Sequence, residues 1–199
     1  MKKWLIPLIV IIIIGFGIYK SLQGFNNTAV EYQEDAKTKW SNVESSYQRR
    51  NDLIGNLVKT VQGAADFEKS TLTSVIEARA KATSTTIDAG NLNAENMAQF
   101  QQAQAGLSSA LSRLLVTVER YPELKANQNF LELQSQLEGT ENRINVARDR
   151  FNAQVNIYNK HIKTFPNTIF AGWFGFDEMA RYQADPGSEK APDVNFDFK

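Results

Sequence analysis

An apolar seam in the C-terminal half of the chain constrains its fold most. Between Phe130 and Phe165, apolar or small residues recur in steps of 3, 4, 3, 4, 3, 4, 4, 3, 4 and 3. Such spacing is typical of one long helix packed in a bundle like a coiled coil, and the doubled step of four is a stutter that relaxes the supercoil. The seam consists of Phe130, Leu133, Leu137, Thr140, Ile144, Ala147, Phe151, Val155, Tyr158, Ile162 and Phe165.

The seam predicts a helix from about Asn127 to Phe165, about 58 Å long at about 1.5 Å per residue. An isolated helix with this composition is not stable in water, so the seam must be buried against other helices. Helical spacing also covers residues 28–82 and 93–121, with a polar loop between them. We therefore predict an all-α fold, an antiparallel bundle of three to four long helices. The first and third helices should run parallel, with the second antiparallel between them.

Local signals suggest where these helices begin and end. Thr28 and Glu31 fit a capping box, although a helix that continues out of the N-terminal apolar segment is an open alternative. Gly63 lies inside the first apolar pattern and predicts a bend. Asn93 is a suitable N-cap for the second helix, and Pro122 ends that helix.

The N-terminal segment predicts one transmembrane helix ahead of the bundle. Residues 4–19 read WLIPLIVIIIIGFGIY without a charge and are flanked by lysines. As a helix they span about 24 Å, slightly less than a hydrocarbon core of about 30 Å. Trp4 and Tyr19 stand where interfacial aromatic residues occur. A cleaved signal peptide is the alternative, but no convincing small-x-small cleavage site follows, so we expect an uncleaved anchor over residues 1–24.

The lysines around this segment favour one orientation by a small margin. The N-terminal amine, Lys2 and Lys3 precede the segment, whereas Lys20 follows it. The positive-inside rule then favours a cytoplasmic N-terminus. We expect a single-pass protein of the inner (cell) membrane, with the bilayer as a partner through residues 4–19 and the bundle on the non-cytoplasmic side.

Composition excludes several kinds of active site. The chain has 22 basic and 22 acidic residues, so it lacks the basic field that would bind nucleic acid. It has no cysteine and a single histidine, His161, which excludes thiol nucleophiles and clusters of several histidines around a metal. No glycine-rich phosphate loop or nucleophilic serine elbow occurs. We expect no enzymatic activity, no cofactor and no catalytic or metal-ligating residue.

A polar row follows the seam of the third helix and predicts a network across the bundle. Arg50 falls on or next to the apolar line of the first helix, so we infer that it meets Glu141 or Glu138, because a buried charge needs a partner. The row is then a layer that sets helix register, or a solvated flank. A functional alternative is a Glu138–Glu141 pair that acts as acid and base or binds a metal, although the Glu-x-x-His pattern of di-iron bundles is absent. The predicted network comprises Arg49, Arg50, Asp52, Asn56, Glu138, Glu141, Arg143, Arg148 and Asn152.

The C-terminal tail, residues 167–199, is rich in aromatic residues. Either these cap the end of the bundle, or they contact a partner or the membrane interface. Residues 194–198, VNFDF, alternate and are compatible with an added edge strand or a frayed end. The predicted interaction residues are Phe170, Trp173, Phe174 and Phe176.

Several strings occur in an order typical of one protein family. They are QRRNDL at 48–53, YPELKAN at 121–127, TENRI at 140–144 and FPN at 165–167, followed by FGF at 174–176. From about residue 29 to 198 the chain resembles the bacterial LemA family, least so over residues 82–96. Two departures stand out: Ser45 and Ser46 replace bulkier residues, and Gly55 stands where proline is common.

The resemblance implies a membrane-anchored LemA-like helical bundle, here residues 25–166, without an established enzymatic activity. Family members are often encoded near other membrane proteins, including TPM-domain proteins and membrane metallopeptidases, which suggests partners in the cell envelope. Family topology has also been drawn with the bundle in the cytoplasm, which conflicts with the orientation that the lysines favour.

The leading hypothesis is a non-enzymatic, membrane-anchored scaffold or adaptor of the bacterial cell envelope. It would act through a protein partner or as a homo-oligomer, because tethering to a surface raises the local concentration of weakly associating molecules. One alternative is a metal-binding or hydrolytic bundle that uses the row of Glu138 and Glu141. Another is an oligomer that remodels membranes.

Overall fold

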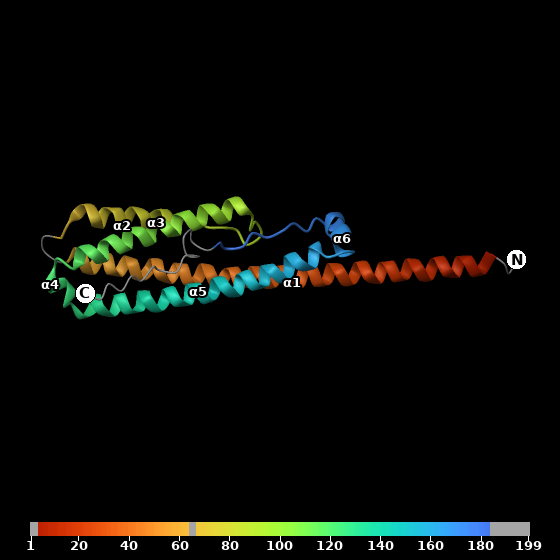
Figure 1. Ribbon diagram of the computed structural model, residues 1–199, viewed down its shortest axis with the longest axis horizontal. Coiled ribbons are helices and arrows are strands. Elements are labelled where there is room, and N and C mark those ends of the chain that lie inside the picture. Colours follow the sequence, from red (N-terminus) through yellow and green to blue (C-terminus); the bar gives the residue numbers. More distant parts are fainter. Residues whose placement is uncertain (1–3, 64–66, 184–199) are drawn as a thin grey trace, which may run out of the picture.

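The computed structural model describes residues 4–63 and 67–183, and its regular elements over these ranges are all helices (Figure 1). The predicted all-α fold is confirmed. The expectation for residues 194–198 concerns residues outside the described part. The helices are α1 (Leu5–Gln62), α2 (Lys69–Ser84), α3 (Ala94–Val118), α4 (Pro122–Lys125), α5 (Gln128–Lys163) and α6 (Asn167–Phe174).

α1 is one unbroken helix of 58 residues that joins the apolar segment to the bundle. Its N-terminal part extends beyond the other helices, and its C-terminal part lies among them (Figure 1). The predicted capping box at Thr28 and Glu31 is wrong, because both residues lie inside α1, where the backbone N–H groups already have helical partners. The alternative of a helix that continues out of the apolar segment is correct.

The predicted parallel arrangement of the first and third long helices is also wrong. Phe25 stacks on His161, Trp40 contacts Phe151, and Arg50 pairs with Glu141, so α1 and α5 run antiparallel. The predicted first helix does not bend at Gly63 but ends there, and its second half returns along the bundle as α2. This extra reversal changes the direction of every later helix.

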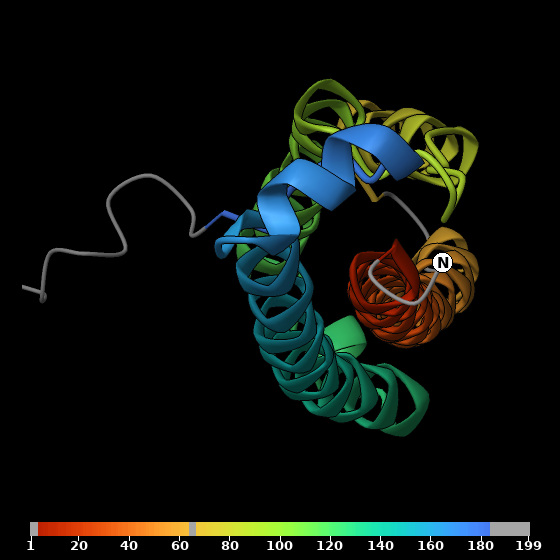
Figure 2. The same ribbon diagram turned by 90° about the vertical axis from the view of Figure 1, so that its right-hand side faces the viewer.

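Four long helices therefore form the bundle. α2 packs against α3 and α1, while α5 packs along α1 (Figures 1 and 2). Asn93 caps α3 as predicted, since its Oδ1 accepts the Asn96 N–H at 2.9 Å, and Asn127 caps α5 through the Phe130 N–H at 3.2 Å. The loop between α2 and α3 contains an Asx turn in which the Gly90 N–H donates to Asp88 Oδ1 at 2.7 Å.

The core has two apolar clusters that follow one another along α1. In the cluster nearer the apolar segment, Trp40 contacts Phe100 and Phe151 with ring centroids 5.3 and 5.2 Å apart. The second cluster gathers aliphatic residues of α1, α2 and α3, such as Leu57 and Leu114. Buried side chains of this size contribute roughly 1.5–3 kcal/mol each, so the bundle rests mainly on these contacts.

The seam of α5 is buried along most of its length, as predicted, with two differences. Leu133 is only half-buried, and Phe165 is 77% exposed. α5 ends at Lys163, and its C-cap Thr164 adopts an extended backbone two residues before Pro166. Phe165 therefore lies outside the helix and does not reach the seam.

Candidate interaction sites

Arg50 is the centre of a buried polar network between three helices. Its side chain extends from α1 and the residue is only 4% exposed. Nη1 donates to Glu141 Oε2 on α5 and to Ser108 Oγ on α3, both at 3.2 Å. Nη2 donates to Gln104 Oε1 on α3 at 2.7 Å. The structure thus brings Arg50 and Glu141 together, while Glu138 lies exposed and accepts from Gln134 Nε2 at 3.4 Å.

Gln104 and Ser108 are the partners that the sequence analysis missed. Gln104 is 3% exposed, and its Nε2 donates to the Ala82 carbonyl at 3.3 Å. The shortest of the three hydrogen bonds that the Arg50 guanidinium donates therefore goes to a buried neutral amide rather than to a carboxylate. Gln104 ends a glutamine-rich run at 99–104 whose sequence predicts a solvated helix face, and at Gln104 that prediction is wrong. Its one available signal was the spacing of four and three residues from Phe100 and Leu107, which puts it near the apolar side of α3.

The remaining predicted network residues do not join Arg50. Asp52 lies on the surface of α1, with Arg79 Nη2 3.9 Å from its Oδ1, and Asn56 is exposed. Arg148 and Asn152 lie on the side of α5 that faces the tail. The predicted network is therefore divided among separate sites, and Arg49 and Arg143 line a further one, a groove between α1 and α5.

Asparagine amides on α5 hold an extended segment, residues 176–183, which we call the strap. Asn159 Nδ2 donates to the Met179 carbonyl at 2.8 Å, and its Oδ1 accepts the Met179 N–H at 3.0 Å. Asn152 makes the same pair of bonds with Tyr182, both at 2.8 Å. Each amide thus satisfies both backbone groups of one strap residue, as a neighbouring β-strand would.

The spacing of these amides matches the strap. Asn152 and Asn159 are two helical turns apart, about 10.5 Å, and three extended residues from Met179 to Tyr182 cover about 10 Å. Tyr158 supports the same segment, because its hydroxyl donates to the Asp177 carbonyl at 2.9 Å. The polar row on α5 is therefore a docking site for the chain's own tail.

Tyr182 anchors the strap beside the Arg50 network. Its hydroxyl lies 2.8 Å from that of Tyr47, and the Arg148 guanidinium lies over its ring at 3.7 Å. Burial raises the pKa of Tyr47 well above the usual value of 10.0, and the neighbouring Tyr182 adds to this rise. The Tyr47 hydroxyl therefore stays protonated at neutral pH and acts as a neutral hydrogen-bonding group.

α6 caps the bundle where the apolar part of α1 leaves it (Figure 1). The Phe25 ring stacks on His161 with centroids 5.2 Å apart, and Phe170 and Phe176 surround it at 5.7 and 5.8 Å. Trp173, by contrast, is 72% exposed. The tail thus divides: Phe170 and Phe176 pack on the bundle, whereas Trp173 and Ile169 face outward. Phe174 is about half exposed, with its ring centroid 6.2 Å from that of Phe25.

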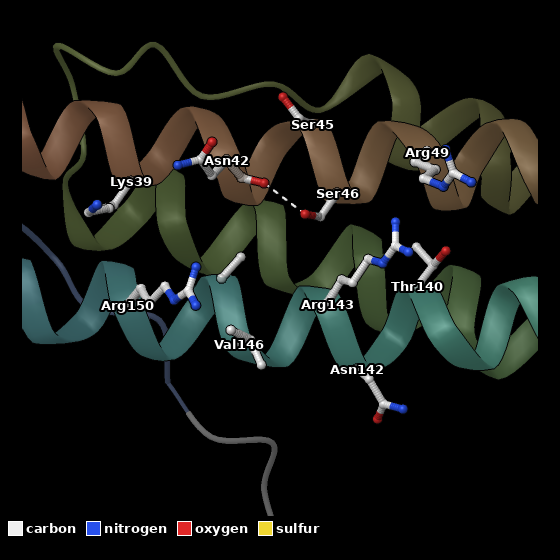
Figure 3. Close-up of a pocket in the computed structure, with 11 residues that line it drawn as sticks. Lys39, Asn42, Ser45, Ser46, Arg49, Thr140, Asn142, Arg143, Val146 and Arg150 are labelled. Carbon is white, nitrogen blue, oxygen red and sulfur yellow. Dashed lines mark hydrogen bonds between the residues drawn. The ribbon is translucent and has the colours of Figure 1, made fainter.

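A basic groove lies between α1 and α5, on the side away from the strap (Figure 3). Its volume is about 610 Å³. The predicted residues Arg49 and Arg143 line it, together with Lys39 and Arg150. Ser45 and Ser46 lie between the cations, and their hydroxyls turn back to the carbonyls of Ser41 and Asn42 at 2.8 Å. The remaining lining residues are Asn42, Thr140, Asn142, Val146 and Ala147.

Within the described part of the chain, α1 is the one helix long and apolar enough to cross a membrane. Its most apolar window of 18 residues has a mean hydropathy of 2.3, and none of that window is buried. Trp4 and Tyr19, at the two ends of the apolar segment, are both exposed. Over the same described residues, no three acidic or histidine side chains gather in a way that would hold a metal ion.

The sequence of this chain is similar to those of several known proteins. The magnetosome proteins MamQ 1 and MamQ 2 of Paramagnetospirillum magneticum are each 28% identical over 82% of this chain. The chain spans 66% of their length, just under two thirds. Protein LemA of Metamycoplasma hominis is 22% identical over 92% of this chain and 80% of its own. Neither name denotes an enzyme. The profile described as "LemA family" matches residues 39–196, and the chain therefore belongs to the LemA family.

Proposed function

We propose that this protein is a non-enzymatic, membrane-anchored scaffold that holds a rigid helical bundle at a fixed height above the inner membrane. The observation that carries the proposal is the continuity of α1. The same helix provides the apolar segment and packs along α5 in the bundle. A flexible linker would let the bundle tumble, whereas a continuous helix fixes its distance and direction.

Anchoring in the membrane promotes association of the bundle with a partner. Confining the bundles to a plane raises their local concentration, so contacts too weak to assemble in solution can assemble on a membrane. The magnetosome relatives, whose name places them in a membrane-bounded organelle, are consistent with such a role at a membrane surface. We propose a protein of the cell envelope or a second copy of this chain as the partner.

The position of α6 next to the apolar segment suits a second contact between the protein and the bilayer. Phe25, around which α6 packs, follows Tyr19 by six residues, about 9 Å along α1. The exposed side chains of Trp173 and Phe174 then lie near the headgroup level, where aromatic residues are favoured. We propose that Trp173 and Phe174 rest in this interface and keep the bundle from tilting.

Membrane extraction tests the anchor. The full chain should stay in the membrane after washing at alkaline pH, and a chain that lacks residues 4–19 should be released as a folded, helical protein. Release of the full chain would refute the proposal. Site-specific photo-crosslinking from exposed positions of α5 in native membranes then tests the scaffold. A discrete adduct with a protein is expected, and its absence from every position would contradict a scaffold role.

Labelling of single cysteines determines which side of the membrane the bundle faces. The chain has no native cysteine, so one Arg113→Cys substitution on the exposed surface of α3 gives an unambiguous label. The lysines favour a bundle on the non-cytoplasmic side, and we propose that side. In cells with a permeabilised outer layer, an impermeant maleimide should then label the cysteine without lysis. Labelling only after lysis would place the bundle in the cytoplasm.

The two alternative functions have less support. The Glu138 and Glu141 side chains do not converge, because Glu138 bonds to Gln134 and Glu141 pairs with Arg50. Stoichiometric metal in the purified protein, lost on Glu141→Gln, would favour the metal-binding alternative. Remodelling would appear as deformation of liposomes by the full chain, and unchanged liposomes would speak against it.

A further inference from the structure

The charged residues that line the basic groove between α1 and α5 all have the same sign. All four of its charged lining residues, Lys39, Arg49, Arg143 and Arg150, are cationic, and no carboxylate lines it. The chain as a whole has equal numbers of acidic and basic residues. Four cations without a lining acid therefore form a local positive field on a chain without net charge.

These cations also have no hydrogen-bond or ion-pair partner among the described residues. None of the four forms a hydrogen bond or ion pair with another residue in the described ranges, whereas Arg50, Arg79, Arg120 and Lys163 all do. Figure 3 shows the Arg143 and Arg150 side chains extending along the groove. Exposed arginines without partners keep all their donors available for an incoming anion.

The cations are arranged in two pairs. The contacts of Trp40 with Phe151 and of Arg50 with Glu141 put Lys39 opposite Arg150 and Arg49 opposite Arg143. Figure 3 shows one pair toward each end of the groove. The pairs are about 10 Å apart along α5 and about 15 Å apart along α1. A ligand that engages both must be elongated and carry anionic groups at its two ends.

The middle of the groove is hollow because its side chains are small. Ser45 and Ser46 line α1 there, facing Ala147 and Val146 of α5. Bulkier residues at 45 and 46, which the family resemblance leads one to expect, would fill this space. The serines therefore leave a shallow apolar and hydroxyl-lined floor between the two cation pairs, in which a backbone or a helix can lie.

The lining favours carboxylates over nucleotides. No aromatic residue lines the groove, so a base has nothing to stack on, and all four cations project from the sides of helices rather than from an N-terminal phosphate cradle. Arginine forks pair well with carboxylates, often in a bidentate manner. Acidic side chains two helical turns apart, or three to four residues apart in an extended chain, match the spacing of the pairs.

The groove lies too far from the membrane in which the protein is anchored for a lipid headgroup of that membrane to be its anionic ligand. Lys39 follows Lys20 by 19 residues, about 29 Å along α1, which is several Debye lengths at physiological salt. This step rests on the proposed anchoring of α1. The ligand must then reach the groove from the aqueous phase beside the bundle.

We propose that the groove binds an acidic polypeptide segment of a partner protein, with its carboxylates seated on the Lys39–Arg150 and Arg49–Arg143 pairs. The segment lies along α1 and α5 as a further element of the bundle. Binding of this kind is electrostatic in large part, so it weakens as salt rises.

Fluorescence anisotropy on the full chain in detergent micelles tests the proposal. The probe is a labelled 14-residue peptide with two acidic clusters seven residues apart, and the comparison peptide has the same composition with its acids grouped in the middle. We expect the spaced peptide to bind at least fivefold more tightly. Arg49→Glu with Arg143→Glu should weaken its binding at least tenfold.

Matched variants separate the groove from general charge and from folding. Lys69→Glu with Arg113→Glu makes the same change in net charge at exposed positions outside the groove and should leave binding within twofold. Ser46→Leu fills the floor without changing charge and should weaken binding severalfold, while helical circular dichroism stays unchanged. Equal losses in the groove and control pairs, or no loss in either, would overturn the proposal.

A binding measurement with a phosphate compound completes the test. Tripolyphosphate that binds tighter than the spaced peptide, and that loses affinity with Arg49→Glu and Arg143→Glu, would assign the groove to a phosphate compound and overturn the polypeptide assignment. Peptide binding in micelles does not depend on where α1 lies in cells. A failure here is therefore distinct from a failure of the anchoring experiment.

Discussion

Substitution of Gln104 tests how the buried Arg50 charge is stabilised. Gln104→Met keeps the length of the side chain and the helix propensity but removes both polar groups. Arg50 Nη2 then loses its 2.7 Å partner in a place where both residues are at most 4% exposed, so water cannot replace it. The Ala82 carbonyl loses its donor at 3.3 Å as well.

The magnitude follows from these contacts. A hydrogen bond to a charged group contributes about 1.5–3 kcal/mol, and the neutral bond to the Ala82 carbonyl about 0.5–1.5 kcal/mol. The apolar thioether offsets part of this sum, so we expect a cost of about 2–3 kcal/mol. Glu141→Gln removes the formal counter-ion of Arg50 but should cost less than about 1 kcal/mol. The Glu141 side chain is 47% exposed, and the glutamine keeps an acceptor in place.

Thermal unfolding of the full chain in detergent, followed by circular dichroism at 222 nm, measures both variants. For a chain of this size about 1 kcal/mol corresponds to about 2–4 °C, so Gln104→Met should lower the Tm by about 4–12 °C and Glu141→Gln by less than about 4 °C. Adding Arg50→Met to Gln104→Met should restore part of the loss, because it removes the unpaired charge. A larger effect of Glu141→Gln than of Gln104→Met, or a further loss in the double variant, would refute the reasoning.

Three other predictions concern the strap and its neighbours. Replacing Asn152 and Asn159 together by leucine should free the strap, so that limited trypsin digestion cuts it at least tenfold faster while the helical dichroism is retained; unchanged cutting would show that the amides do not hold it. Gly175 ends α6 with φ 72°, so Gly175→Ala should cost about 1–2 kcal/mol, read as a drop in Tm, and no drop would contradict the left-handed cap. Burial raises the pKa of Tyr158 to about 12 and that of Tyr47 further, so the unfolding free energy should fall as pH rises above 10, where only the unfolded state ionises. Denaturant titrations at pH 9–11 measure this fall, Tyr47→Phe should reduce it, and a stability that rises over this range would contradict the burial.

The polar row of α5 illustrates how much of the site could be predicted from sequence. Its 3 and 4 spacing marks one helix face, and Arg50 on α1 indicates a charge in need of a partner, so Glu141 and Glu138 could be named in advance as the two candidates. The role of Asn159 could not, because it depends on Met179 in a segment without periodicity. An asparagine amide that binds a backbone leaves no mark in the sequence of the strap, since any residue offers the same N–H and carbonyl.

The directions of the helices also could not be predicted from the sequence alone. A break at Gly63 and a bend at Gly63 give the same apolar pattern on either side, because the pattern records which face is buried and not where the chain turns. The contact of Arg79 with Asn51, whose carbonyl accepts a hydrogen bond from the Arg79 Nε–H at 2.7 Å, shows that α2 returns along α1. One missed reversal was enough to misplace the directions of α1 and α5 relative to each other.

The sequence by itself determined the helical class, the apolar segment at residues 4–19, the cap at Asn93, the start of α5 near Asn127 and most of the α5 seam. These are properties of short stretches, set by periodicity, capping and transfer of side chains from water. The tertiary structure alone decided that α1 is continuous from the apolar segment into the bundle, that Arg50 finds Gln104 at a separation of 54 residues, and that four cations border one groove. Those features depend on which distant faces meet, and many helix pairings bury nearly the same apolar area.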